Sequence, residues 1–173
     1  MCSFNSNSLL RSHFENCTLL TECEQESLAK WTQVPSWRKI YNANADGFSE
    51  ADFHKHCDGV SPTITVMKGG DNIYVGYTTA PWDSTKGTWV EDKEAFVYSA
   101  TTGRIVVTKP HQAVYIGSSY PWWGVLGIQR PKGHTEPKLY CSKNSFYSGW
   151  DHLTSNAQLS EFEVYSPQSM IDM

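Results

Sequence analysis

The sequence predicts a β-rich α+β fold, an antiparallel two-sheet β-sandwich with a few short helices at the N-terminus and edges. Short runs of Val, Ile, Tyr, Thr and Phe recur from residue 37 onward, separated by turn residues. Such closely spaced short strands favour a sandwich over a parallel sheet, which needs long crossover helices. The 7 Trp and 9 Tyr residues supply apolar area for the core of a 173-residue chain, the length of one domain.

The strands are expected where β-branched and aromatic residues cluster. The predicted strands span residues 37–42, 62–68, 72–79, 95–99, 104–108, 113–117, 138–141 and 161–165. Residues 69–72 (GGDN) and 101–103 (TTG) have the composition of tight turns, so each predicts a hairpin between its neighbouring strands.

Two helices are predicted before residue 37. The first begins after Ser8 and presents three apolar residues on one face, at i, i+4 and i+7. These are Leu10, Phe14 and Cys17. The second opens with a capping box from Thr21 to Glu24 and ends before Pro35. We therefore divide the chain into a helical lead-in packed on the domain (1–36), a sandwich (37–166) and a C-terminal tail (167–173).

A further short helix is predicted to interrupt the strands near residues 50–57. Ser49 can cap it, and Asp52 can reach back from the third helical position. Phe48 and Phe53 occupy the two positions of a hydrophobic staple, and Gly59 offers a left-handed exit.

Charge and hydropathy exclude several classes of function. With 14 Lys and Arg against 18 Asp and Glu, the chain lacks the positive charge expected of a nucleic-acid binder. No apolar run is long enough to span a membrane. The first residues do not read as a signal peptide, and the five widely spaced cysteines read as reduced thiols, so we expect a cytoplasmic protein. A secreted mature form is the alternative.

A series of short motifs occurs in a fixed order along the chain. The motifs are 37–41 (WRKIY), 46–49 (DGFS), 52–54 (DFH), 57–59 (CDG), 62–65 (PTIT), 76–78 (GYT), 81–82 (PW), 95–99 (AFVYS), 113–115 (AVY), 118–120 (SSY) and 161–165 (EFEVY). In this order they resemble the signature of TLDc domains. The resemblance covers about residues 37–166, and the preceding helices fit the family's usual lead-in.

The resemblance implies a two-sheet sandwich and a regulatory role without catalysis. TLDc proteins are linked to protection against oxidative stress, and several bind the peripheral sector of the vacuolar proton ATPase. Similar domains also occur beside extracellular modules, so the resemblance also allows a secreted role. The chain departs from the family pattern at Val75 before Gly76, at residues 122–127 and at residues 153–157. We expect these departures to leave the fold unchanged and to affect a family-specific partner surface.

The polar residues with catalytic potential favour structural roles. His54 and His56 point about 200° apart on a helix, and Cys57 falls near the apolar face, so we expect no shared metal. Asp46 and Asp58 adjoin glycines, where a carboxylate usually holds a turn, and we expect them not to converge with His54.

Other polar patterns also give no enzyme signature. Glu161 and Glu163 share a strand face, so one of them is expected to pair with Arg38 or Lys39 on a neighbouring strand. No nucleophile elbow, phosphate loop or dinucleotide fingerprint is present in the sequence. We therefore expect no cofactor and treat an enzyme as the minority interpretation.

Aromatic residues in predicted loops are the candidate binding residues: Trp82, Trp89, Tyr120, Trp122 and Trp123. Adjacent residues of an extended chain face opposite ways, so one of the paired tryptophans can be buried while the other reaches the surface. Exposed rings suit a protein hot spot or the face of a sugar. The alternative is that these rings close the ends of the sandwich. The sequence leaves two partner classes open, a protein complex such as the vacuolar proton ATPase, or a carbohydrate bound in a lectin-like manner by a secreted defence protein.

Overall fold

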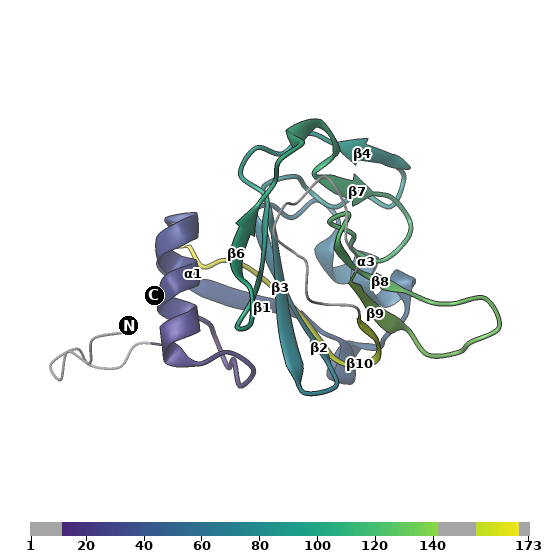
Figure 1. The fold of residues 1–173 in the computed structure, drawn as a ribbon, viewed down its shortest axis with the longest axis horizontal. Helices are drawn as coiled ribbons and strands as arrows, with labels where there is room; N and C mark the ends of the chain where they lie inside the picture. Colours follow the sequence, from purple (N-terminus) through teal and green to yellow (C-terminus); the bar gives the residue numbers. More distant parts are fainter. Residues whose placement is uncertain (1–11, 142–154, 170–173) are drawn as a thin grey trace, which may run out of the picture.

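The computed structural model describes residues 12–141 and 155–169, and it confirms the predicted fold class (Figure 1). The helices of the described residues are α1 (Glu22–Thr32), α2 (Ala43–Asp46) and α3 (Glu50–Cys57), and a short 3₁₀ turn at Pro110–Gln112 precedes β7. The strands of the described residues are β1 (Trp37–Asn42), β2 (Thr63–Gly69), β3 (Asn72–Thr78), β4 (Thr88–Val90), β5 (Phe96–Ser99), β6 (Gly103–Val106), β7 (Val114–Ile116), β8 (Leu126–Gln129), β9 (Lys138–Cys141) and β10 (Ser155–Pro167). No helix within these ranges has the length and apolar character needed to cross a membrane.

The long strand β10 joins two layers of antiparallel sheet. Its first residues, 155–158, pair with β9, and its later residues pair with β2 and β1. The first layer runs in the order β6-β5-β3-β2-β10, with β1 on the far side of β10. The second layer contains β8 and β9 together with the two-stranded sheet of β4 and β7. Isolated bridges at Trp122 connect β7 to β8, so the second layer continues across this junction.

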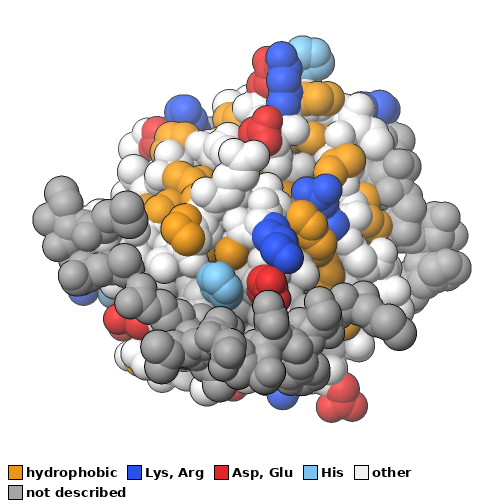
Figure 2. All heavy atoms as spheres, turned by 90° about the vertical axis from the view of Figure 1, so that its left-hand side faces the viewer, with side chains coloured by type: hydrophobic (Ala, Val, Ile, Leu, Met, Phe, Trp, Pro, Cys, Tyr) orange, Lys and Arg blue, Asp and Glu red, His pale blue; other side chains and the backbone are white. Residues whose placement is uncertain are grey.

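Residues 12–36 cover the outer face of the first layer. Figure 1 shows α1 on the opposite side of this layer from β8 and β9. Phe14 and Leu28 are fully buried there, together with Trp37 of β1 and Val75 of β3. Figure 2 shows that on this side of the molecule apolar side chains reach the surface in separate patches, with charged groups of both signs between them.

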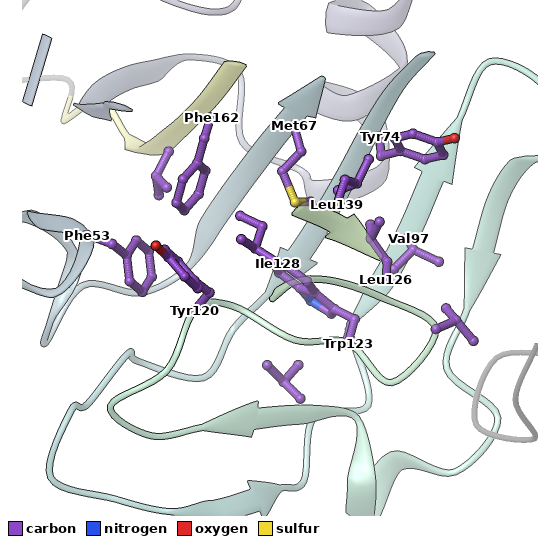
Figure 3. Packing of buried hydrophobic residues seen from close by; sticks show 14 of the residues in the cluster. Phe53, Met67, Tyr74, Val97, Tyr120, Trp123, Leu126, Ile128, Leu139 and Phe162 are labelled. Carbon is purple, nitrogen blue, oxygen red and sulfur yellow. The ribbon is translucent and has the colours of Figure 1, made fainter. Parts of the chain in front are cut away.

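The main core fills the space between the two layers. Figure 3 shows the rings of Phe53, Tyr120 and Phe162 gathered at one end of it, with Trp123 contributed from the second layer. The ring of Phe53 stacks on that of Phe162 with centroids 5.6 Å apart. Burial of large rings such as these supplies much of the stabilising apolar area of the core.

The predicted caps and hairpins are present. Ser49 accepts a hydrogen bond from the Asp52 amide while the Asp52 carboxylate accepts one from the Ser49 amide, so both parts of the capping box form. Thr21 caps α1 in the same way. Gly59 and Gly70 adopt positive φ angles of 77° and 60°, the conformation that their predicted exit and turn require.

The predicted helix after Ser8 is wrong for the part that the structure describes. Residues 12–20 are not helical, because Phe14 instead bridges to Trp37 beside β1 and buries its ring in the first layer. The start of that prediction lies outside the described residues. Strands β4 and β8 and the first part of β10 were not predicted.

One expectation about the cysteines is corrected. Cys17, Cys57 and Cys141 are reduced, as expected, but Cys23 is disulfide-bonded. The division of the chain at residues 36 and 166 stays a prediction.

The predicted ion pair on β10 forms between Glu163 and Lys39. Their charged atoms lie 2.9 Å apart, and the Glu163 side chain is only 4% exposed. The Lys39 ammonium also donates to the carbonyl of Asn16, and the Tyr165 hydroxyl donates to the other oxygen of Glu163. The pair therefore ties the lead-in to two strands of the first layer, a structural role.

Candidate functional site

A row of half-buried aromatic side chains crosses the outer face of the second layer. Register pairs join Trp89 to Tyr115, Tyr115 to Trp122, Trp122 to Gly127 and Gly127 to Tyr140. We call Trp89, Tyr115, Trp122 and Tyr140 the aromatic row. Neighbouring strands lie about 4.8 Å apart, so the four steps of the row span roughly 19 Å.

Strand alternation turns these four rings away from the core. Val114 and Ile116 are buried on either side of Tyr115, and Leu139 and Cys141 are buried on either side of Tyr140. A strand directs successive side chains to opposite faces, so the tyrosines must point outward. The same alternation separates outward Trp122 from buried Trp123.

The rings of the row contact one another in pairs. Trp122 and Tyr140 stack with centroids 5.2 Å apart and an interplanar angle of 23°. Trp89 and Tyr115 meet edge to face, with centroids 5.7 Å apart. Aromatic pairs in these arrangements gain roughly 0.5–1.5 kcal/mol beyond their buried area. The row is therefore held in place before any partner arrives.

Glycines make room for the rings. Gly127 lies between Trp122 and Tyr140, and a Cβ added there would meet the Trp122 ring at 2.4 Å. A Cβ at Gly117 would meet the Tyr115 ring at 3.0 Å. Because these two glycines have no side chains, both rings can pack directly against the backbone of the sheet.

The neighbouring outward positions of the second layer are mostly uncharged. Gln129, Lys138 and Gln158 form a register row parallel to the aromatic row, and Asn156 pairs with Tyr140. Gln129, Asn156 and Gln158 are exposed amides, which both donate and accept hydrogen bonds. The surface is therefore aromatic and amide-rich, with one cation among these four positions.

The five aromatic residues predicted as binding residues separate into two groups. Trp89 and Trp122 are half-buried members of the row, whereas Trp82, Tyr120 and Trp123 are at most 3% exposed. The indole N–H of Trp82 donates to Thr63, and that of Trp123 donates to the carbonyl of Tyr77. These polar contacts and the ring contacts between Trp82 and Trp123 belong to the core.

Sequence reasoning missed Tyr115 and Tyr140. Each stands in the middle of a predicted strand, between two apolar residues, in the runs Val114-Tyr115-Ile116 and Leu139-Tyr140-Cys141. The period-two pattern of those runs was the signal that could have placed both rings outward.

A polar cluster, separate from the aromatic row, lies at the end of α3. The Nδ1 atom of His54 is 2.6 Å from Oδ1 of Asp58, and its Nε2 atom is 2.9 Å from the carbonyl oxygen of Ser119. The expectation that neither Asp46 nor Asp58 would converge with His54 is wrong for Asp58, because the i, i+4 spacing brings the two side chains together on the helix. Asp46 instead lies 3.7 Å from His56.

The electrostatics of this cluster keep Asp58 ionised. Burial favours the neutral acid, but hydrogen bonds from His54 and from Ser84 outweigh it and hold the pKa of Asp58 below its usual value. Burial raises the pKa of the Cys57 thiol, as do nearby carboxylates, so Cys57 remains a protonated core residue. Among the described residues, no three His, Cys, Asp or Glu side chains converge as metal ligands would.

Comparison with known proteins identifies the family. No curated protein matches the chain. The family model of the TLDc domain matches residues 12–166, which is nearly the whole chain. The resemblance read from the motifs is thereby confirmed, and the chain belongs to the TLDc domain family.

Proposed function

We propose that this TLDc domain is a non-catalytic interaction module that docks on a protein complex through the aromatic row. The observation that carries the proposal is the register of Trp89, Tyr115, Trp122 and Tyr140 on one outer sheet face. Half-buried Trp and Tyr rings are the commonest hot-spot residues, because each covers a large area with few rotatable bonds.

The chemistry of the polar cluster supports a role without catalysis. Both ring nitrogens of His54 are occupied by Asp58 and by a backbone carbonyl, so neither is available to take a substrate proton. Cys57 is fully buried, with a raised thiol pKa, which disfavours a nucleophilic thiolate. A docking module needs neither group to react.

The partner we propose is the peripheral sector of the vacuolar proton ATPase, with a role in protection against oxidative stress and a cytoplasmic location. The support for this partner is membership of the TLDc family, to which such roles are attached. The low charge of the aromatic row supports a contact dominated by apolar burial, whose affinity depends less on salt than an ion-paired contact.

A binding assay with the purified peripheral sector tests the proposal. The wild-type domain should bind, and Trp89→Ala should weaken binding by more than about 1 kcal/mol. Trp31→Ala is the matched control, because Trp31 is a half-buried tryptophan that contacts Phe96 over the first layer. Equal loss of binding in both variants, or none in Trp89→Ala, would count against the aromatic row.

Carbohydrate recognition by a secreted protein is the second candidate. Exposed Gln129, Asn156 and Gln158 beside the rings favour it, since amides can donate to and accept from sugar hydroxyls. The disulfide at Cys23 also favours it, because disulfides persist in oxidising compartments. Titration with simple sugars, read by tryptophan fluorescence, separates the candidates: a saturable change that is absent in Trp122→Ala supports this one.

A further inference from the structure

His54 is a buried histidine whose two ring nitrogens both face hydrogen-bond acceptors. Its side chain is 8% exposed, and it lies between the carboxylate of Asp58 and the carbonyl of Ser119. A carbonyl accepts only, and so does an ionised carboxylate, whereas a neutral imidazole carries a single N–H. Only the imidazolium, with two N–H groups, satisfies both contacts.

The cluster connects three segments that are distant in sequence. His54 and Asp58 belong to the last turn and the end of α3, and Asp58 also accepts the amide of Ser84 at 3.0 Å. Ser119 belongs to residues 117–121, a loop on the second layer. We call His54, Asp58 and the Ser119 carbonyl the His54 clamp.

The clamped loop joins the two central members of the aromatic row. Tyr115 precedes the loop and Trp122 follows it, and the Tyr115 amide donates to the Trp122 carbonyl at 2.9 Å. The loop has a second attachment to the start of α3, since the Tyr120 hydroxyl donates to the carbonyl of Phe48 at 2.6 Å. The loop is therefore attached to both the start and the end of α3, and its position depends on that helix.

We propose that the His54 clamp is a pH-sensitive latch on the loop between Tyr115 and Trp122. When His54 carries two protons, the clamp holds the loop against α3. When the imidazolium releases a proton to solvent as the pH rises, the remaining N–H serves one acceptor only. The Ser119 contact then opens, because the charge on Asp58 holds the single proton on Nδ1.

Of the titratable groups around the His54 clamp, His54 is the one whose protonation state is proposed to change. Asp58 stays ionised over the pH range in which histidines titrate, because its pKa lies below the usual value. Asp83 is nearby, and its carboxylate is bound by Thr85. On the other side of the loop, Glu50 pairs with Arg130, and burial raises the pKa of Tyr120 to about 12, so its hydroxyl remains a donor.

Ring-nitrogen NMR of the wild-type domain over pH 5–9 tests the latch directly. At low pH both His54 nitrogens should show the imidazolium signature, and the amide signals of Ser119, Tyr120 and Trp122 should shift with the titration of His54. His56 is the internal control on the same helix. A neutral His54 ring at pH 5, or loop signals that do not follow its titration, would overturn the proposal.

Hydrogen exchange in a His54→Gln variant provides the second measurement. Exchange of the Tyr115 amide and of the Ile128 amide, which donates to the Pro121 carbonyl, should rise roughly tenfold relative to wild type at low pH. His56→Gln should leave both rates unchanged. Equal rates in the His54→Gln and wild-type domains would contradict the latch. If His54→Gln does not fold, the wild-type titration decides alone.

The functional consequence of the latch rests on the proposed role of the aromatic row. The two tests of the latch itself do not depend on that role. Neither measurement uses a partner, so a failed binding assay leaves the latch intact, and a failed latch leaves docking intact. If both hold, binding by Trp122 should weaken above the pH at which His54 loses its proton, while binding by Trp122→Ala should show no such change.

Discussion

The ring of Trp122 lies directly on the backbone of Gly127 in the neighbouring strand of the second layer. A Cβ built on Gly127 meets ring carbons at 2.4 and 2.8 Å, distances that real side chains do not tolerate. The ring also stacks on that of Tyr140. Gly127 is therefore the position at which a single methyl group displaces the centre of the aromatic row.

The first prediction is that Gly127→Ala destabilises the domain. Insertion of a methyl group against a packed ring costs about 1–3 kcal/mol. Urea unfolding followed by circular dichroism measures this loss. Gly87→Ala is the matched control, because its nearest contact is the Tyr115 hydroxyl at 3.8 Å, and it should change stability by less than about 0.5 kcal/mol. Unaltered stability of Gly127→Ala would mean that the Trp122 ring is free to move aside.

The second prediction concerns the start of α3. Ser49→Ala removes the side-chain acceptor of the Asp52 amide, 3.1 Å away, and should cost about 0.5–2 kcal/mol. Ser49→Thr keeps a capping hydroxyl and should retain most of the stability. Thermal melts of the two variants beside wild type distinguish a cap from a surface serine, and equal melting of all three would contradict the capping role.

The third prediction is a large loss of stability in Phe53→Ala. The Phe53 ring is fully buried and contacts the rings of Tyr41, Trp82 and Phe162. Truncation of such a ring costs about 3–5 kcal/mol, because a cavity remains among neighbours that cannot collapse into it. Chemical denaturation gives the value, and Phe53→Leu should lose less. A Phe53→Ala domain with wild-type stability would show that Phe53 is not a core residue.

Much of the fold follows from local patterns in the sequence. The capping box at Ser49 and the Gly70-Asp71 turn are each specified by residues close together in the chain. Strand β4 was missed because it has only three residues, and β8 was missed because Gly127 in its interior lowers its strand propensity. The pairing of β4 also depends on β7, from which it is separated in the sequence by strands β5 and β6.

The candidate site was less predictable than the fold. Trp82 and Trp122 both stand in irregular segments after a proline, yet one ring is in the core and the other is half-exposed. The difference arises from tertiary contacts, such as the hydrogen bond from the Trp82 indole to Thr63. By contrast, the i, i+4 spacing of His54 and Asp58 was readable in the sequence once α3 had been predicted.

The last prediction concerns acid stability and uses Asp58. Its folded-state pKa is lower than that of an unfolded aspartate, about 3.9, so the ionised carboxylate stabilises the fold. That contribution is complete above the unfolded value and is lost as the pH falls through the folded one. Asp52, held by Ser49, and Asp83, held by Thr85, also have lowered pKa values and contribute to the same acid transition.

Asp58→Asn removes one of these three contributions. The variant should be less stable than wild type at pH 7, and the difference should narrow as the pH falls from about 5 to 2, because protonation removes the same charge from the wild-type domain. Urea midpoints at several pH values measure this, and Asp71→Asn in the exposed β2–β3 turn is the control. A difference that stays constant with pH would mean that Asp58 acts through its shape alone and that its charge is not what holds His54 and Ser84.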